Sequence, residues 1–201
     1  DIPGTYSLFA HSAEEEVARD FLCFGGADAA VVVCDATCLE RNLNLVLQTI
    51  EILPRTVVCI NLMDEAEKKK IRIDLDKLEN LLGVPVVAAS AREGKGMDAL
   101  MEALESLLCV TSLQPVQLKY PQPVEQAVSH ILPETAAFLA RIHRSLPPRW
   151  AALQLLQDSL SLNTALLGRL GELPPSLNRK ITDAQSQLAE ASVTPDALQD
   201  K

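Results

Sequence analysis

Three short apolar runs, separated by stretches with helical spacing, constrain the fold of this chain most. The runs are AAVVVC at 29–34, TVVCI at 56–60 and VPVVAA at 84–89. Continuous apolar runs of this length are typical of strands that are covered on both faces. The stretch after the first run repeats its apolar residues at helical intervals, namely Leu39, Leu43, Val46, Ile50 and Leu53. Strands that alternate with helices predict a parallel sheet in an α/β layer arrangement.

The first part of the sequence also contains residues that predict where helices begin and end. Two capping boxes, 12–15 and 37–40, predict helix starts. Behind the first box, Val17, Phe21 and Phe24 fall on one helical face. Gly83 is expected to close a short leucine-bearing helix before the third strand.

The pattern changes after Val110. The stretch TSLQPVQLKYPQP is polar and proline-containing, which indicates a linker, and no strand-like run follows it. Helical spacing then returns from residue 124, with Pro133 either kinking that helix or starting another, and again over 150–156 and 177–188. We therefore expect a partial α/β domain over 1–110, a linker over 111–122 and an all-helical domain over 123–201.

Composition excludes several classes of protein. The net charge of −9 argues against a partner with a phosphate backbone, so no nucleic-acid binding is expected. No apolar run approaches the roughly 20 residues of a membrane-spanning helix. The five cysteines are odd in number and irregularly spaced, which favours reduced, buried thiols over a disulfide framework or a metal site.

The opening DIPG is the first of three loops whose residues could bind a ligand. In a nucleotide-dependent switch, an aspartate at the position of Asp1 can hold Mg²⁺ through water. Gly4 would let its backbone N–H approach a γ-phosphate without interference from a Cβ atom. Taken alone, D-x-x-G is a common turn.

The other two loops each follow an apolar run. Asp64 can accept two hydrogen bonds from the ring N–H and exocyclic amine of guanine, a pair that adenine does not offer. Asn61 can brace this loop and reach the purine edge. In the loop that begins with Ser90, the small Ala91 and the following Arg92 would let a backbone N–H reach the guanine carbonyl oxygen, with Ser90 orienting the turn.

The order D-x-P-G, N-x-x-D, S-A matches the third to fifth motifs of Ras-like GTPases. More narrowly, the segments DIPGTYSL, EEEVARDFL, DATCLERNL, NLMDEA and SAREGKG resemble the cytosolic GTPase domain of the ferrous iron transport protein B (FeoB) family. The resemblance covers residues 1 to about 108. It continues more weakly through RWAALQLL at 149–156, which is similar to the family's helical domain that modulates GDP release.

The resemblance implies the GTP-binding portion of a prokaryotic Fe²⁺ transporter, with GTP or GDP and Mg²⁺ as ligands. Its partner would be a membrane domain of the same protein, and its location the cytoplasmic face of the bacterial inner membrane. By position, the site residues would be Asp1 and Gly4 at the phosphates, and Asn61, Leu62, Asp64, Ser90, Ala91 and Arg92 at the base. Tyr6 to Arg19 would form the second switch. Thr5, just before it, occupies the place of the water-orienting Gln of Ras-like proteins.

Two departures qualify this expectation. The sequence contains no G-x-x-x-x-G-K-[ST], so the fold is expected to be a truncated Ras-like sheet that lacks its first strands and phosphate loop. The strand at 29–34 would then have an unpaired apolar edge, and the chain alone would have negligible GTPase activity. Leu62 also stands where N-K-x-D proteins have Lys. This replacement of the Lys fits the family resembled.

Two other functions remain open from the sequence. A ribosome-associated GTPase would share the fold, but it would require a basic RNA-binding extension. A non-hydrolysing interaction module would keep only the base pocket and bind a partner without GTP.

Overall fold

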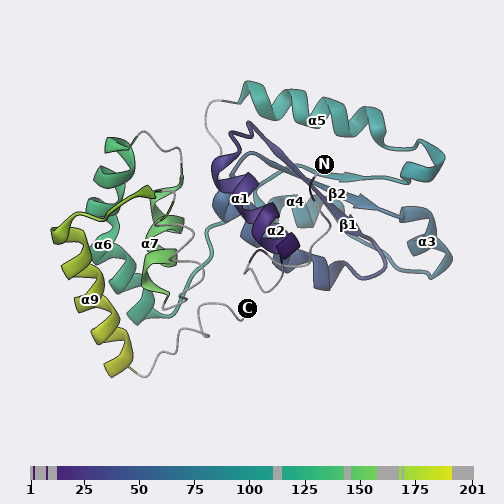
Figure 1. Cartoon of the computed structure of the whole chain (residues 1–201). Helices are drawn as coiled ribbons and strands as arrows, with labels where there is room; N and C mark the ends of the chain where they lie inside the picture. The colour runs from purple at the N-terminus through teal and green to yellow at the C-terminus, as the bar shows by residue number, and fades with distance from the viewer. Residues whose placement is uncertain are drawn as a thin grey trace. The chain divides into compact units, whose positions relative to one another are not determined.

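The computed structural model describes residues 2, 8, 13–110, 115–142, 146–157, 168 and 170–191. The chain divides into two compact units, Asp1–Gln117 and Leu118–Lys201, which are described separately below (Figure 1). Among the described helices, none has both the length and the apolar character needed to cross a bilayer.

The first unit is built on a parallel sheet with the order β1-β2-β3. The strands are β1 (Ala30–Asp35), β2 (Thr56–Asn61) and β3 (Val86–Ala88). In register, Cys34 lies opposite Ile60, which in turn lies opposite Ala88. The α/β prediction is confirmed, with strand limits that shift by one or two residues. Within the described residues β1 pairs on one edge only, and Val33 on it is 61% exposed.

Helices cover both faces of this sheet. They are α1 (Ala13–Phe24), α2 (Leu39–Ile52), α3 (Met63–Lys68), α4 (Leu75–Leu82) and α5 (Met97–Cys109). The core on one face joins Val32, Cys34, Val58 and Ile60 to apolar residues of α2 and α4. Helix α5 packs against β2 and β3 and lies across the sheet from α2 and α4 (Figure 1).

The helix boundaries confirm some predictions and correct others. Gly83 ends α4 in the left-handed conformation at φ 67°, as expected. The prediction of a capping box at 37–40 is wrong. Helix α2 starts after Cys38, which makes no side-chain cap hydrogen bond. Instead the backbone N–H of Thr37 donates to Asp35 Oδ1 at 2.7 Å, so the aspartate closes a local turn before the helix. Ser12, the start of the other predicted box, lies outside the described residues.

Two further features of the first unit differ from the sequence pattern. The apolar face of α1 is partly open, because Val17 and Phe21 are about half exposed, whereas Ala18 and Arg19 are buried. Helix α3 forms inside the charged stretch after Asn61, where no helix was expected. At six residues it is too short and too polar to show a helical repeat.

In the described part of the second unit, all regular secondary structure is helical, as predicted. It contains α6 (Gln122–Arg141), α7 (Pro148–Leu156) and α9 (Pro175–Glu190), and α6 packs against both of the others. Pro133 lies inside α6, so the alternative in which it starts a new helix is wrong. Trp150 is 95% buried, at 5% exposure, and anchors this core together with residues such as Ile131 and Leu177.

The helices α6, α7 and α9 all begin at prolines. Pro121, Pro147 and Pro174 occupy the N-cap positions, and each helix has a second proline in its first two residues. Proline suits this position because its missing N–H would have no partner inside the helix.

Residues 116 and 118 of the predicted linker accept or donate hydrogen bonds within the unit to which each belongs. The backbone N–H of Val116 donates to the carbonyl oxygen of Leu82 at 2.8 Å, within the first unit. In the second unit, Arg149 Nη2 donates to the carbonyl oxygen of Leu118 at 3.0 Å. The Arg149 guanidinium also forms a two-pronged ion pair with Glu125, at 2.8 and 2.9 Å.

Candidate functional site: the loops that follow β2 and β3

The first loop of the candidate site begins where β2 ends. Asn61 is the last residue of β2, and its register with Asp35 fixes it at the carboxyl edge of the sheet. Leu62 then adopts a left-handed conformation, φ 64° and ψ 33°, which turns the chain into α3. This backbone conformation is costly for a residue other than glycine, so it marks a constrained position. Asp64 lies in the first turn of α3, and its side chain is 19% exposed.

The second loop follows β3. Ser90 is buried and precedes the 3₁₀ turn η1 (Ala91–Glu93), whose residues are exposed. The turn is closed by an isolated bridge between Ser90 and Lys95. Ser90 N donates to the Lys95 carbonyl at 3.1 Å, and Lys95 N donates to the Ser90 carbonyl at 3.3 Å.

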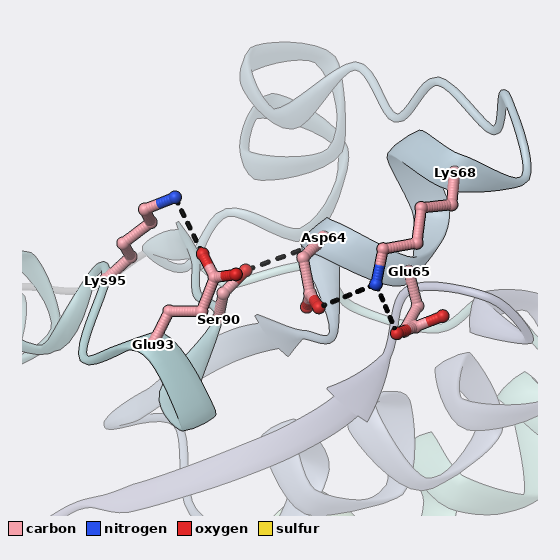
Figure 2. A network of polar contacts seen from close by, with 6 residues as sticks. All are labelled: Asp64, Glu65, Lys68, Ser90, Glu93 and Lys95. Atoms are coloured by element: carbon pink, nitrogen blue, oxygen red, sulfur yellow. Dashed lines mark hydrogen bonds and ion pairs between the residues drawn. The ribbon is translucent and has the colours of Figure 1, made fainter.

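Three hydrogen bonds join the two loops. Ala91 N donates to Asn61 Oδ1 at 3.0 Å. Asp64 N donates to Ser90 Oγ at 3.2 Å (Figure 2). Met63 N donates to the Ala89 carbonyl at 3.2 Å. The loops are therefore held edge to edge through side-chain and backbone groups of both. This adjacency is what parallel strands require, since their carboxyl ends meet at one edge of a sheet.

Each of the two loops carries a lysine that forms an ion pair. Lys68 Nζ lies 2.8 Å from Glu65 Oε1 and 3.7 Å from Asp64 Oδ2, while Lys95 Nζ lies 2.7 Å from Glu93 Oε2 (Figure 2). Hydrogen bonding to Glu65 raises the pKa of Lys68, and hydrogen bonding to Glu93 raises the pKa of Lys95. Both lysines therefore remain cationic at neutral pH, one on each loop.

The structure brings most of the predicted base-site residues to one place. Asn61, Asp64, Ser90 and Ala91 are linked as described, and Leu62 sits between the first two. Arg92 is exposed in η1. Asp1, Gly4, Thr5 and Tyr6 lie outside the described residues. Sequence reasoning did not single out Glu65, Glu93 or Lys95; their charge next to a loop motif was the available signal.

The cysteines do not form a metal site in the described part of the chain, where no cluster of three candidate ligands occurs. Cys34 and Cys59 are buried on neighbouring strands, but the prediction of buried thiols is wrong for Cys38 and Cys109, which are exposed. Burial raises the pKa of the Cys34 thiol to about 12, so this group is a protonated core side chain at neutral pH.

The family follows from a comparison of the sequence with known protein families. Residues 1–104, more than half of the chain, match the family described as ferrous iron transport protein B. This chain is a member of that family. Among curated relatives, the Fe(2+) transporter FeoB of Salmonella typhimurium is 35% identical over 164 residues, and that of Escherichia coli K12 is 34% identical over 167. These alignments cover 80% of this chain and 20% of each relative, so the chain spans about a fifth of their length.

Solved structures of FeoB cytosolic domains share the fold. A mutant S. thermophilus NFeoB bound to GDP aligns with a TM-score of 0.81 and 30% identity, covering 99% of this chain and 74% of that one. NFeoB of S. thermophilus bound to mGMPPNP gives a TM-score of 0.78 at 30% identity, covering 99% and 72%. The cytosolic domain of the T. maritima FeoB iron transporter in GDP form I gives 0.72 at 28%, covering 99% and 74%.

Proposed function

We propose that this chain contributes the guanine-recognition half of a GTP-binding switch that controls ferrous iron uptake. The proposal depends chiefly on the pairing of the two loops, in which Asn61 and Asp64 of one meet Ala91 and Ser90 of the other. The FeoB structures that share the fold were solved with GDP and mGMPPNP. The Fe²⁺ cargo and a membrane domain of the same protein follow from the names of the relatives.

The base-site residues have the chemistry that guanine requires. The Asp64 carboxylate would accept the ring N–H and the exocyclic amine, and adenine would leave it unpaired in a partly buried position. Ala91 N–H, which donates to Asn61 in this structure, would be shared with the guanine carbonyl oxygen. Leu62 would lie against the ring face, and exposed Arg92 would border the pocket.

The phosphate side of the site is proposed from the family resemblance. Asp1 would hold Mg²⁺ through water, and Gly4 would bring its N–H to the γ-phosphate. Bound Mg²⁺ would supply charge neutralisation at the β- and γ-phosphates. Thr5 and Tyr6 would belong to the second switch. Because the sequence has no Walker-type lysine loop, the chain alone is expected to bind nucleotide weakly and to hydrolyse it negligibly.

The test is a titration of the isotopically labelled 201-residue chain, followed by NMR. GDP is expected to shift the amide signals of residues 61–64 and 90–92, while ADP leaves them unchanged. Asp64→Asn is expected to remove the GDP response and to create one to xanthosine diphosphate. The amide keeps one acceptor for the ring N–H and offers one donor, which suits the carbonyl that xanthine has in place of the exocyclic amine. Asp76→Asn on the exposed surface of α4 is the matched control. Equal responses to GDP and ADP would reject guanine recognition.

The transport role has its own test. The full-length gene is expected to restore Fe²⁺-dependent growth to bacteria that lack ferrous iron uptake, and the Asp64→Asn version to restore it poorly. Full rescue by Asp64→Asn would separate base recognition from iron uptake.

A further inference from the structure

Gly96 lies in unusually close contact with the end of β3. It is the N-cap residue of α5 and has a φ of 80°. A Cβ atom added to it would lie 2.2 Å from the carbonyl oxygen of Ala88 and 3.0 Å from Ala89 Cα. Both neighbours are backbone atoms of β3 or of the residue after it, so no side-chain rotation can relieve the overlap. Any larger residue must displace either α5 or the loop.

Gly96 is connected directly to the base-site loop. Lys95, the residue before it, forms both backbone hydrogen bonds of the bridge that closes the turn with Ser90. At the other end of the same turn, Ser90 Oγ accepts from Asp64 N and Ala91 N donates to Asn61 Oδ1. A shift at Gly96 is therefore expected to pass through Lys95 to two of the three hydrogen bonds between the loops, those of Ser90 and Ala91.

A second glycine in the turn, Gly94, allows the effect of the steric contact to be distinguished from the effect of the left-handed backbone conformation. Gly94 has a similar φ of 70°, but a Cβ atom added to it would meet nothing within 4 Å. Alanine at either position bears a comparable conformational cost, because both lie in the left-handed region. Only at Gly96 does it also collide with the backbone.

From this geometry we infer that Gly96 is a positioning residue for guanine recognition. Its bare Cα rests against Ala88 and Ala89 and holds the 90–95 turn where Ala91 and Ser90 meet Asn61 and Asp64. The inference rests on the proposed function for its ligand, but the positioning itself can be measured without one.

The experiment compares Gly96→Ala with Gly94→Ala in the 201-residue chain. The first readout is hydrogen exchange at the Ala91 amide without nucleotide. Exchange is expected to be about tenfold faster in Gly96→Ala, since a lost hydrogen bond is worth roughly that factor, and within about twofold of wild type in Gly94→Ala. The second readout is the difference between the GDP and ADP shifts at Ala91 and Asp64, which only Gly96→Ala is expected to lose.

The outcomes are decisive in either direction. Wild-type exchange at Ala91 in Gly96→Ala, or an intact GDP response despite faster exchange, would overturn the inference. If Gly96→Ala is too unstable, Gly96→Asn carries the same Cβ on a residue that tolerates positive φ. Failure of both to fold would make Gly96 a folding residue and also overturn it. A wild-type chain without any GDP response would refute the proposed function, while the exchange comparison would still support the positioning role.

Discussion

Asn61 and Ala91, thirty residues apart in the chain, are joined by a 3.0 Å hydrogen bond from the alanine N–H to the asparagine side-chain oxygen. Asn61 is the last residue of β2, and Ala91 is the first residue of the turn η1 that follows the neighbouring strand β3. The bond therefore ties the geometry of the candidate base site to the register of the sheet itself.

Asn61→Ala is expected to free the 90–95 turn. Loss of this hydrogen bond should lower the free energy of unfolding by about 1 kcal/mol and accelerate exchange at the Ala91 amide. Urea unfolding and NMR exchange measure the two effects. The control is Asn80→Ala, whose amide bonds to the Asp76 carbonyl on the exposed side of α4. Equal Ala91 exchange in both variants would contradict the prediction.

Arg149→Met is expected to destabilise the second unit. The change removes two hydrogen bonds to Glu125 and one to the Leu118 carbonyl. Because the two side chains are 27% and 33% exposed, solvent screening limits the loss to about 1–2 kcal/mol. Thermal unfolding measures it, with Arg179→Met on the exposed surface of α9 as control.

Arg149→Lys refines this test. Lysine keeps the charge but cannot form the planar two-pronged contact, so an intermediate loss is expected. If lysine is as good as arginine, charge alone accounts for the contact with Glu125.

Asp35 is expected to contribute to acid unfolding of the first unit. The hydrogen bond from the Thr37 backbone N–H lowers the pKa of this carboxyl below its ordinary value of 3.8. The folded state thus favours the ionised form, and the resulting stability is present above about pH 4 and lost as the pH falls through the lower folded pKa. Asp35→Asn should flatten this dependence in thermal melts between about pH 2 and 6, while Asp76→Asn serves as the exposed control. An unchanged acid limb would reject the role of Asp35.

Lys70→Gly is expected to stabilise the first unit. Lys70 is exposed and has a φ of 58°, a conformation that glycine adopts without steric cost. The relief should exceed the entropy that glycine adds to the unfolded chain and raise the free energy of unfolding by about 0.5–1 kcal/mol. Lys69→Gly, where φ is −82°, should do the opposite. Chemical denaturation that shows loss of stability for both would indicate that the Lys70 side chain is needed.

The sheet and the meeting of the two loops could be predicted because both follow from periodicity and from the geometry of parallel strands. Uninterrupted runs such as 56–60 have few alternatives to a covered strand. Once β2 and β3 are parallel neighbours, Asn61 and Ser90 must lie at the same edge. The leucine helix closed by Gly83 was predictable for a similar reason, since its signals are all local.

Other features depend on competition that the sequence does not show. Thr37 has the residue type of a helix cap, but the carboxylate of Asp35 takes its N–H first. Pro133 would break an isolated helix, yet α6 continues through it because buried neighbours such as Ile131 and Thr135 hold both halves in one core. The close approach of Gly96 to Ala88 depends on how α5 packs against β3, and no local sequence pattern predicts it.

The proline pairs that open α6, α7 and α9 have a consequence for solution behaviour. A helix that starts with a serine or aspartate cap can fray when its cap is mutated, protonated or screened by salt. Ring closure fixes the backbone of these three starts by covalent bonds instead. In acid or high salt, unfolding of the second unit should therefore begin in its packed interior or at the carboxyl ends of these helices. The first turns of α6, α7 and α9 should be among the last to open.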